Sequence, residues 1–213
     1  MPVEADAVEF DAEAIRLESI RAEDEYSGTR AVLPARCGLA RLGLQIDMGL
    51  GDSVWPAPRR CTYPAVLDFP QPEVFAYPRE AVVAEKVEAL VVLGDRNSRI
   101  KDFFDLHHLA SRFTFDRATL SEALQRTFER RRTPVPHEAP IGLTPAYWEN
   151  PSRPIQVRAF ARRAGLELPD DPGREFTELL GAFLLPLVED LRRGEGREGH
   201  WTPGGPWRVQ PGA

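Results

Sequence analysis

The chain has 213 residues, of which 42% are hydrophobic and 28% are charged, a balance that fits one soluble globular domain with room for a subdomain division. Its formal net charge of −6, without a Lys-rich block or a basic tail, excludes a nonspecific nucleic-acid coat protein. The acidic first residues contain no secretory signal, and no apolar run reaches the roughly 20 residues of a membrane span. We therefore expect no membrane association.

Two residue types are scarce. Cys37 and Cys61 are too few for a disulfide framework and lack metal-ligand spacing with any histidine, so we expect core or loop residues in a reducing, bacterial cytoplasm. Of the 27 basic residues, only Lys86 and Lys101 are lysine. Arginine replaces lysine readily on a surface but not where a compact, strongly hydrated point charge is required. These two positions are therefore candidates for a site that needs lysine.

Strand patterns fill residues 8–48. Period-two alternation predicts four strands, separated by turns that include one at 25–30 and one at 49–52; they are Val8–Phe10, Ile15–Ile20, Ala31–Ala35 and Leu42–Met48. In the last strand, Leu42, Leu44 and Ile46 share one face and Asp47 lies on the other. The pattern predicts a meander of antiparallel strands.

The segment 55–78 contains six prolines and predicts an extended, turn-rich connector, which aromatic side chains can hold against the core. Helical spacing of apolar residues then predicts a helix that begins at Pro78 and ends at Gly94. A second helix can be capped by Asn97 or Ser98, and a third by Asp116.

The remaining sequence predicts two more helices. After a loop-like segment at 133–154, a basic amphipathic helix covers 155–164, and a long helix covers 172–193 with a kink or break near Pro186. We expect three regions, which are a sheet with its connector (1–78), a helical domain (79–193) and a disordered tail (194–213). Because strands come first and helices follow, the fold class is α+β.

Asp47 is the first candidate site residue. A carboxylate near the end of a strand, opposite the apolar face, can hold Mg²⁺, which prefers oxygen ligands and shares them with substrate phosphates. The alternative is a solvent-facing strand aspartate.

Lys86 is the second candidate. It lies beside the apolar face of its helix, where its ammonium group can neutralise phosphate oxygens as a point charge. The alternative is a local ion pair with Glu85 or Glu88.

The next helix supplies the third candidate. Arg99, Lys101 and Asp102 cluster in its first turn, which is the arrangement of a nucleotide site at a helix N-terminus. The alternative is helix capping and dipole compensation by Asp102 and Asp105, with a Lys101–Asp105 pair.

Other polar clusters carry weaker signals. His107 and His108 have no partner at metal-ligand spacing, and one of them is expected to be a packed helix residue. Arg126 and the run 130–132 form a candidate basic face for nucleic acid, with a solvated helix end as the alternative. The sequence contains no Walker A motif and no nucleophile elbow.

Three motifs that occur in this order resemble the nucleotidyltransferase toxins of the AbiEii/AbiGii type. They are IDMGLGD at 46–52, VAEKVEAL at 83–90 and NSRIKDFFDL at 97–106, and ALQRTF at 123–128 resembles the helix that follows in that family. The resemblance covers roughly residues 8–135.

The resemblance implies a fold and an activity. These toxins are similar to polymerase-beta-like nucleotidyltransferases, so it implies an antiparallel or mixed sheet followed by a helical domain. It implies Mg²⁺-dependent transfer of a nucleotidyl group from an NTP, which is GTP or another nucleotide, to an acceptor such as tRNA. It also implies a cognate antitoxin as partner.

The resemblance also implies roles for individual residues. Asp47 matches the lone third strand carboxylate that holds the metal, and Lys86 matches the helix lysine that binds phosphate. Asp102 matches the essential acid of the last motif. Arg99 and Lys101, beside it, complete the implied nucleotide-binding set.

One part of the family pattern is not found. No glycine-rich phosphate loop and no Asp-x-Asp pair precede Asp47, so we expect a sheet that is incomplete at its N-terminal end. One carboxylate is a poor Mg²⁺ site. An alternative function is therefore a catalytically incomplete fragment that binds a nucleotide or a protein, and a third is a domain whose charged motifs are only caps and ion pairs.

Overall fold

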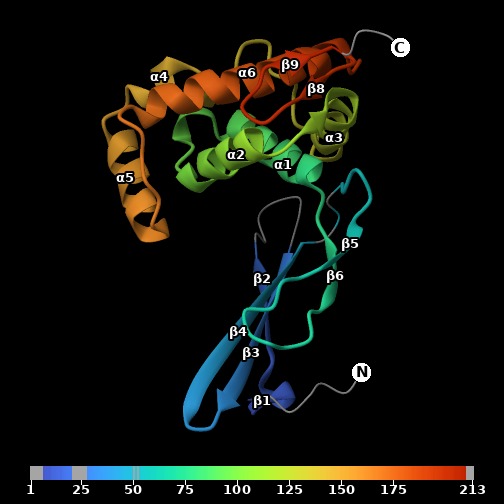
Figure 1. Ribbon diagram of the computed structural model, residues 1–213, viewed down its shortest axis with the longest axis vertical. Helices are drawn as coiled ribbons and strands as arrows, with labels where there is room; N and C mark the ends of the chain where they lie inside the picture. Colours follow the sequence, from blue (N-terminus) through green and yellow to red (C-terminus); the bar gives the residue numbers. More distant parts are fainter. Residues whose placement is uncertain (1–6, 21–27, 50, 52, 210–213) are drawn as a thin grey trace. The chain divides into compact units, whose positions relative to one another are not determined.

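The structure, a computed structural model, describes residues 7–20, 28–49, 51 and 53–209. The chain divides into two compact units, Met1–Asp52 and Ser53–Ala213, which are drawn in Figure 1. The first unit is built of strands and the second contains the helices, so the α+β class expected from the order of the elements is confirmed.

The first unit is an antiparallel sheet centred on one long strand, β3. This strand pairs with β1 and β2 on one edge and with β4 on the other. The bounds are β1 Val8–Phe10, β2 Arg16–Ile20, β3 Gly28–Cys37 and β4 Ala40–Gly49, with a short 3-10 helix at Ala12–Ala14. The meander of β2, β3 and β4 confirms the predicted strands. Of the predicted turns, residues 25–27, 50 and 52 lie outside the described part.

The register gives the sheet two different faces. Leu17, Ala31 and Ile46 stand beside one another on one face, while Arg30 and Asp47 are partners on the opposite face. The alternation predicted for β4 is therefore confirmed, and it places the Asp47 carboxylate among charged side chains of neighbouring strands.

The second unit begins with a hairpin in the segment 55–78, which the sequence predicts to be an extended connector. Strands β5 (Arg59–Thr62) and β6 (Glu73–Ala76) pair in antiparallel fashion and belong to the unit that contains the helices. No proline lies inside either strand, so every backbone group needed for the ladder is present. Cys61 lies on β5 and Cys37 at the end of β3, both exposed, so neither is the core or loop residue expected.

The helices of the second unit start and end near their predicted signals. Helix α1 begins directly after Pro78 and ends at Gly94, and Asp116 caps α3 by accepting a hydrogen bond from the Thr119 amide at 2.8 Å. Helix α6 continues through Pro186. The bounds are α1 Arg79–Leu93, α2 Ile100–Arg112, α3 Arg117–Arg130, α4 Pro145–Trp148, α5 Ser152–Ala164 and α6 Pro172–Arg193.

The hydrophobic core lies among α1, α2, α3 and α6. Its largest fully buried side chains include Phe103, Leu124, Tyr147 and Phe183. Short 3-10 helices at Gly94–Arg96 and Ile141–Leu143 connect the helices around this core. The core fixes α1 against α2, which matters for the site because Lys86 and Asp102 lie on these two helices.

The prediction of a disordered tail from residue 194 is corrected for the described residues 194–209. Strands β8 (His200–Trp201) and β9 (Trp207–Arg208) extend β7 (Phe115–Asp116) into a small antiparallel sheet. Trp201 is fully buried, and its indole N–H donates to the Ala110 carbonyl at 2.7 Å. The buried Trp201 ring, which contacts the half-buried Trp207 ring with 5.5 Å between centroids, supplies the apolar contact that a Gly- and Pro-rich composition does not suggest.

None of the helices in the described part of the chain has the length and apolar character needed to cross a bilayer.

Candidate functional site

The start of α2 is held by side chains from later helices. Asn97 is buried, and its side-chain oxygen accepts a hydrogen bond from the Arg99 amide at 2.9 Å. The Asn97 carbonyl accepts from the Tyr147 hydroxyl and from Arg153 Nη1, each at 2.6 Å, and Arg153 also donates to the Asp95 carbonyl. The first turn of α2 therefore has a fixed position against α4 and α5. Asn97 acts in the loop, and the N-cap residue is Arg99 rather than Asn97 or Ser98.

Both lysines of the chain meet at this turn. Lys86 Nζ lies 2.6 Å from Asp102 Oδ1 and 2.7 Å from Asp105 Oδ2. Lys101 Nζ lies 2.8 Å from the same Asp105 Oδ2, and Arg99 Nε lies 2.7 Å from Asp102 Oδ2 without the alignment of a hydrogen bond. Three cations thus surround two carboxylates, which leaves the cluster with one positive charge in excess.

Burial separates the members of this cluster. The side chains of Asp102 and Lys86 are 4% and 13% exposed, whereas those of Arg99 and Lys101 are 48% and 67% exposed. A buried carboxylate requires a partner, and Lys86 supplies it across 16 positions of sequence. We call Lys86, Arg99, Lys101, Asp102 and Asp105 the lysine cluster.

The local alternative for Lys86 is wrong. Its neighbours on α1 are paired elsewhere: Glu88 accepts from Arg131 at 2.8 Å and from the Thr133 hydroxyl at 2.5 Å, and Glu85 accepts from the Tyr77 hydroxyl. The alternative reading of α2 is partly confirmed, because the Lys101–Asp105 pair is present.

The cluster changes the acidity of Asp105. Burial alone would raise the pKa of this carboxyl, but hydrogen bonds and charge from Lys101 and Lys86 together hold the pKa below its ordinary value. Asp105 therefore stays ionised next to both lysines at neutral pH. Sequence spacing links it only to Lys101, four positions earlier.

Asp47 lies in the other unit and has its own partners. Arg30 donates to both of its carboxylate oxygens, at 2.8 and 3.0 Å, and Gln45 Nε2 lies 3.2 and 3.3 Å from them. The hydrogen bond from Arg30 holds the pKa of Asp47 below its ordinary value. The structure brings Lys86, Arg99, Lys101 and Asp102 together within the second unit, whereas Asp47 belongs to the first.

The described residues do not offer a complete Mg²⁺ site. No group of three or more His, Cys, Asp or Glu side chains in this part of the chain is arranged to hold a metal ion. Both oxygens of Asp47 already accept from Arg30, and the carboxylates of the lysine cluster are bound by cations. The metal role of Asp47 stays a prediction.

The basic face predicted around Arg126 is largely neutralised. Arg126 pairs with Glu122 at 2.7 Å and stacks on Trp55, with its guanidinium carbon 4.0 Å from the ring centroid. Arg131 turns inward to Glu88 and Glu85, at 2.8 and 3.8 Å. Arg126 and Arg131 are therefore already paired with glutamates, and the nucleic-acid role of this face stays a prediction.

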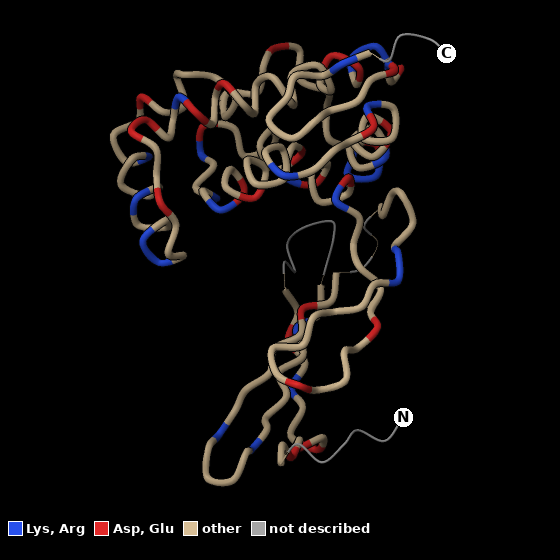
Figure 2. Tube along the Cα trace, viewed as in Figure 1, with Lys and Arg blue, Asp and Glu red and all other residues tan. Residues whose placement is uncertain are grey.

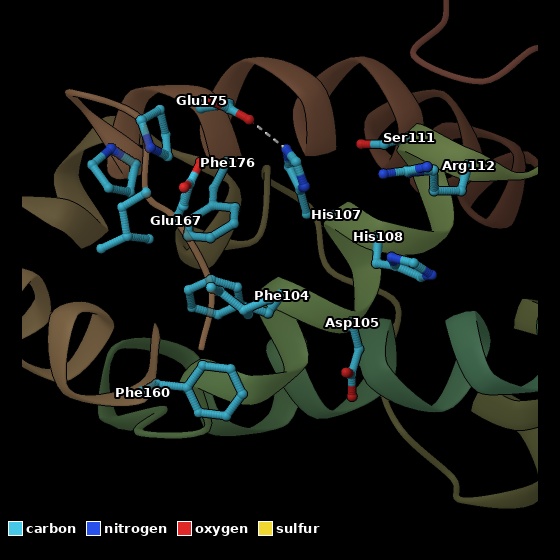
Figure 3. A pocket seen from close by; sticks show the side chains of 14 residues that line it. Phe104, Asp105, His107, His108, Ser111, Arg112, Phe160, Glu167, Glu175 and Phe176 are labelled. Carbon is cyan, nitrogen blue, oxygen red and sulfur yellow. Dashed lines mark hydrogen bonds and ion pairs between the residues drawn. The ribbon is translucent and has the colours of Figure 1, made fainter. Parts of the chain in front are cut away.

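A pocket of about 540 Å³ lies along the outer face of α2 (Figure 3). Phe104, Phe160 and Phe176 form its aromatic wall, and the His107 ring lies 2.7 Å from Glu175 Oε1. His107 packs edge-on against Phe176, with 5.5 Å between ring centroids, so the expectation of a packed helix residue is confirmed for it. No spacing signal in the sequence predicts this pocket, because its residues come from α2, α5, α6 and the segment 166–169.

Comparison with known protein families identifies the family of the chain. The family model described as nucleotidyl transferase AbiEii toxin, type IV TA system, matches residues 2–182, which include the sheet, the hairpin and the lysine cluster. No curated protein and no solved structure matches the chain. The chain therefore belongs to the AbiEii nucleotidyltransferase toxin family of type IV toxin–antitoxin systems.

Proposed function

We propose that this protein binds a nucleoside triphosphate at the lysine cluster and moves a nucleotidyl group to an acceptor such as tRNA, as the toxin component of a toxin–antitoxin pair. The observation that carries the proposal is the position of Lys86 on α1, whose ammonium group lies between the carboxylates of Asp102 and Asp105. Both aspartates lie on α2, which is held in place by the core and, at its start, by Asn97. The family membership supports the reaction class and a cognate antitoxin partner.

The geometry supports a phosphate-binding role for Lys86. An ammonium group has three N–H donors, and Lys86 directs two contacts to Asp102 and Asp105, which leaves one donor for a phosphate oxygen. Asp102 is the positioning residue, because its buried carboxylate orients Lys86. Arg99 and Lys101 are exposed beside it and add charge that a triphosphate can meet.

In the proposed reaction, the acceptor hydroxyl attacks the α-phosphorus in line. The new P–O bond forms as the bond to pyrophosphate breaks, pyrophosphate leaves, and the hydroxyl proton passes to solvent. Lys86 offsets negative charge on the triphosphate during this step. Mg²⁺ is proposed as the cofactor from the family alone, and since the described residues do not form its site, no step is derived through it.

The test is transfer of label from an α-³²P-labelled NTP to tRNA by the 213-residue protein with Mg²⁺. We expect labelling that Lys86→Met and Asp102→Asn lower by about 100-fold or more, in the range of lost electrostatic catalytic contacts. Arg174→Ala, which removes an exposed α6 ion pair, is the control and should label as the unaltered chain does. Equal labelling by Lys86→Met would contradict the proposal.

The second candidate function is a nucleotide-binding module without catalysis. The Arg30–Asp47 pair favours it, because both oxygens of the proposed metal ligand are occupied. NTP binding that depends on Lys86, with no labelling under any metal condition, would support this candidate. Mg²⁺-dependent labelling of tRNA would exclude it.

A further inference from the structure

A second pocket lies on the other side of α2 from the core, between its first turn and α5. Its volume is about 570 Å³, and its charged lining residues are all basic: Arg99, Lys101, Arg162 and Arg163. Ser98 and Gln156 add neutral polar groups. Figure 2 shows how basic residues follow one another along α5. We call this pocket the cationic groove.

The cationic groove adjoins the aromatic pocket on the same helix. Phe160 lines both, and its ring contacts Phe104, with 4.7 Å between centroids. Phe160 and Phe104 are only partly buried, so both rings offer surface to the pocket, as Figure 3 shows. The two pockets therefore share the Phe160 ring: one carries cations, and the other carries half-open aromatic faces together with the carboxylates of Asp105, Glu167 and Glu175.

The charges of the groove are available to a ligand. The side chains of Arg162 and Arg163 are exposed and form no ion pair or hydrogen bond in the described part of the chain, in contrast to those of Arg126 on α3 and Arg131 directly after it. Arg99 and Lys101 belong to the lysine cluster, whose total charge is positive. The groove thus has unbalanced positive charge next to the proposed nucleotide site.

We propose that the cationic groove and the aromatic pocket bind a single-stranded segment of RNA, with phosphates on Arg162, Arg163 and Lys101 and a base on the rings of Phe160 and Phe104. A row of cations beside aromatic faces suits single-stranded nucleic acid, whose backbone is an anion at every step and whose bases stack on aromatic rings. An acidic peptide would match only the cations. This inference rests on the proposed function only for the identification of the RNA as the acceptor.

The first experiment measures equilibrium binding of a short, labelled single-stranded RNA to the full chain, without NTP or metal. Replacing Arg162 and Arg163 by glutamate is expected to weaken binding at least tenfold. It should also lower the slope of log affinity against log salt by about 1.4, or 0.7 for each lost phosphate contact. Arg158→Glu is the matched control, because Arg158 is exposed on the same helix but lines a different pocket. Equal weakening by the control, or no weakening by the double variant, would overturn the proposal.

The second experiment tests the base-binding end. Phe160→Leu keeps an apolar side chain but removes the ring, and we expect it to weaken binding about fivefold or more, as lost base stacking does. The same substitution should not change the affinity for an RNA of equal length without bases. Melting temperatures of all variants establish that they are folded. An equal loss with both RNAs, or an acidic peptide of equal charge that binds as tightly as RNA, would overturn the assignment.

These measurements separate the two proposals. RNA binding that depends on Arg162 and Arg163, in a chain that transfers no nucleotide, would support the groove and contradict the proposed reaction. Nucleotide transfer by a chain whose RNA affinity is unchanged in the double glutamate variant would do the reverse.

Discussion

Two carboxylate–cation pairs, one in each unit, carry the residues that the family motifs select, and they differ in burial and in chemistry. Asp47 and Arg30 are 43% and 33% exposed and face each other across two strands in a two-pronged contact. Asp102 and Lys86 are 4% and 13% exposed and join two helices. An arginine fork satisfies both carboxylate oxygens, whereas a lysine between two carboxylates keeps a donor for a third anion. The comparison favours the helical unit as the place of the proposed phosphate-binding charge.

The comparison is tested most strongly by removing the buried cation. Lys86→Met leaves Asp102 buried without its main partner, and we expect the free energy of unfolding to fall by about 3 kcal/mol. Urea unfolding followed by tryptophan fluorescence measures this, because all four tryptophans lie in the second unit. Lys101→Met, which alters an exposed side chain at the same cluster, is the control and should cost far less. Equal losses would mean that burial does not distinguish the two lysines.

A smaller effect is expected for the carboxylate. Asp102→Asn keeps the size and one acceptor oxygen of the side chain but removes its charge, so we expect a loss of about 2 kcal/mol in the free energy of unfolding. A double variant with Lys86→Met should lose much less than the sum of the two single losses, because both break the same contact. Additive losses would contradict the pairing.

The dependence of stability on pH in the acid range gives a further test of the comparison. Asp105 has a pKa below its ordinary value because Lys101 and Lys86 outweigh the effect of burial. A carboxyl with a depressed pKa in the folded state stabilises the fold above its unfolded pKa of about 3.9 and loses this contribution as pH falls through the folded pKa. Asp105→Asn should therefore be less stable than the unaltered chain near neutral pH, and the difference should shrink below about pH 4. A pH series of melting temperatures measures this, and a constant difference would contradict it.

The smallest effect is expected at the exposed pair. Asp47→Asn alters a contact on the open face of the sheet, and exposed pairs contribute little to stability, so the melting temperature should change hardly at all. Arg30→Gln serves as the reciprocal variant. A large drop in melting temperature for either would mean that the Arg30–Asp47 pair holds the sheet together and would remove the contrast between the units.

Local signals allowed much of this fold to be predicted. Helix boundaries at Pro78, Gly94 and Asp116 depend on contacts within a few residues, so the local sequence is enough to predict where these helices begin or end. The β5–β6 hairpin and the ordered tail depend on pairing across longer distances, as between Trp201 and Ala110, and composition alone points away from them.

The site was predictable to the same extent. The motifs select Lys86 and Asp102, but the contact between them requires α1 to pack on α2. The second partner of Lys86, Asp105, is found only from the three-dimensional structure. In the basic face predicted at Arg126 and 130–132, Arg126 and Arg131 pair with glutamates on α3 and α1, whereas the cations of the cationic groove come from α2, the residue before it, and α5. Charge counts along a sequence do not reveal which cations are already paired.

The most direct test of the central claim is the affinity for GTP and ATP of Lys86→Arg beside Lys101→Arg, measured by calorimetry on folded protein. If the Lys86 ammonium between Asp102 and Asp105 is the phosphate-binding group, the bulkier guanidinium cannot take its place, and affinity should fall at least tenfold for Lys86→Arg, or about 1.4 kcal/mol. The exposed Lys101→Arg should bind almost as the unaltered chain does. Unchanged nucleotide affinity in Lys86→Arg would contradict the account.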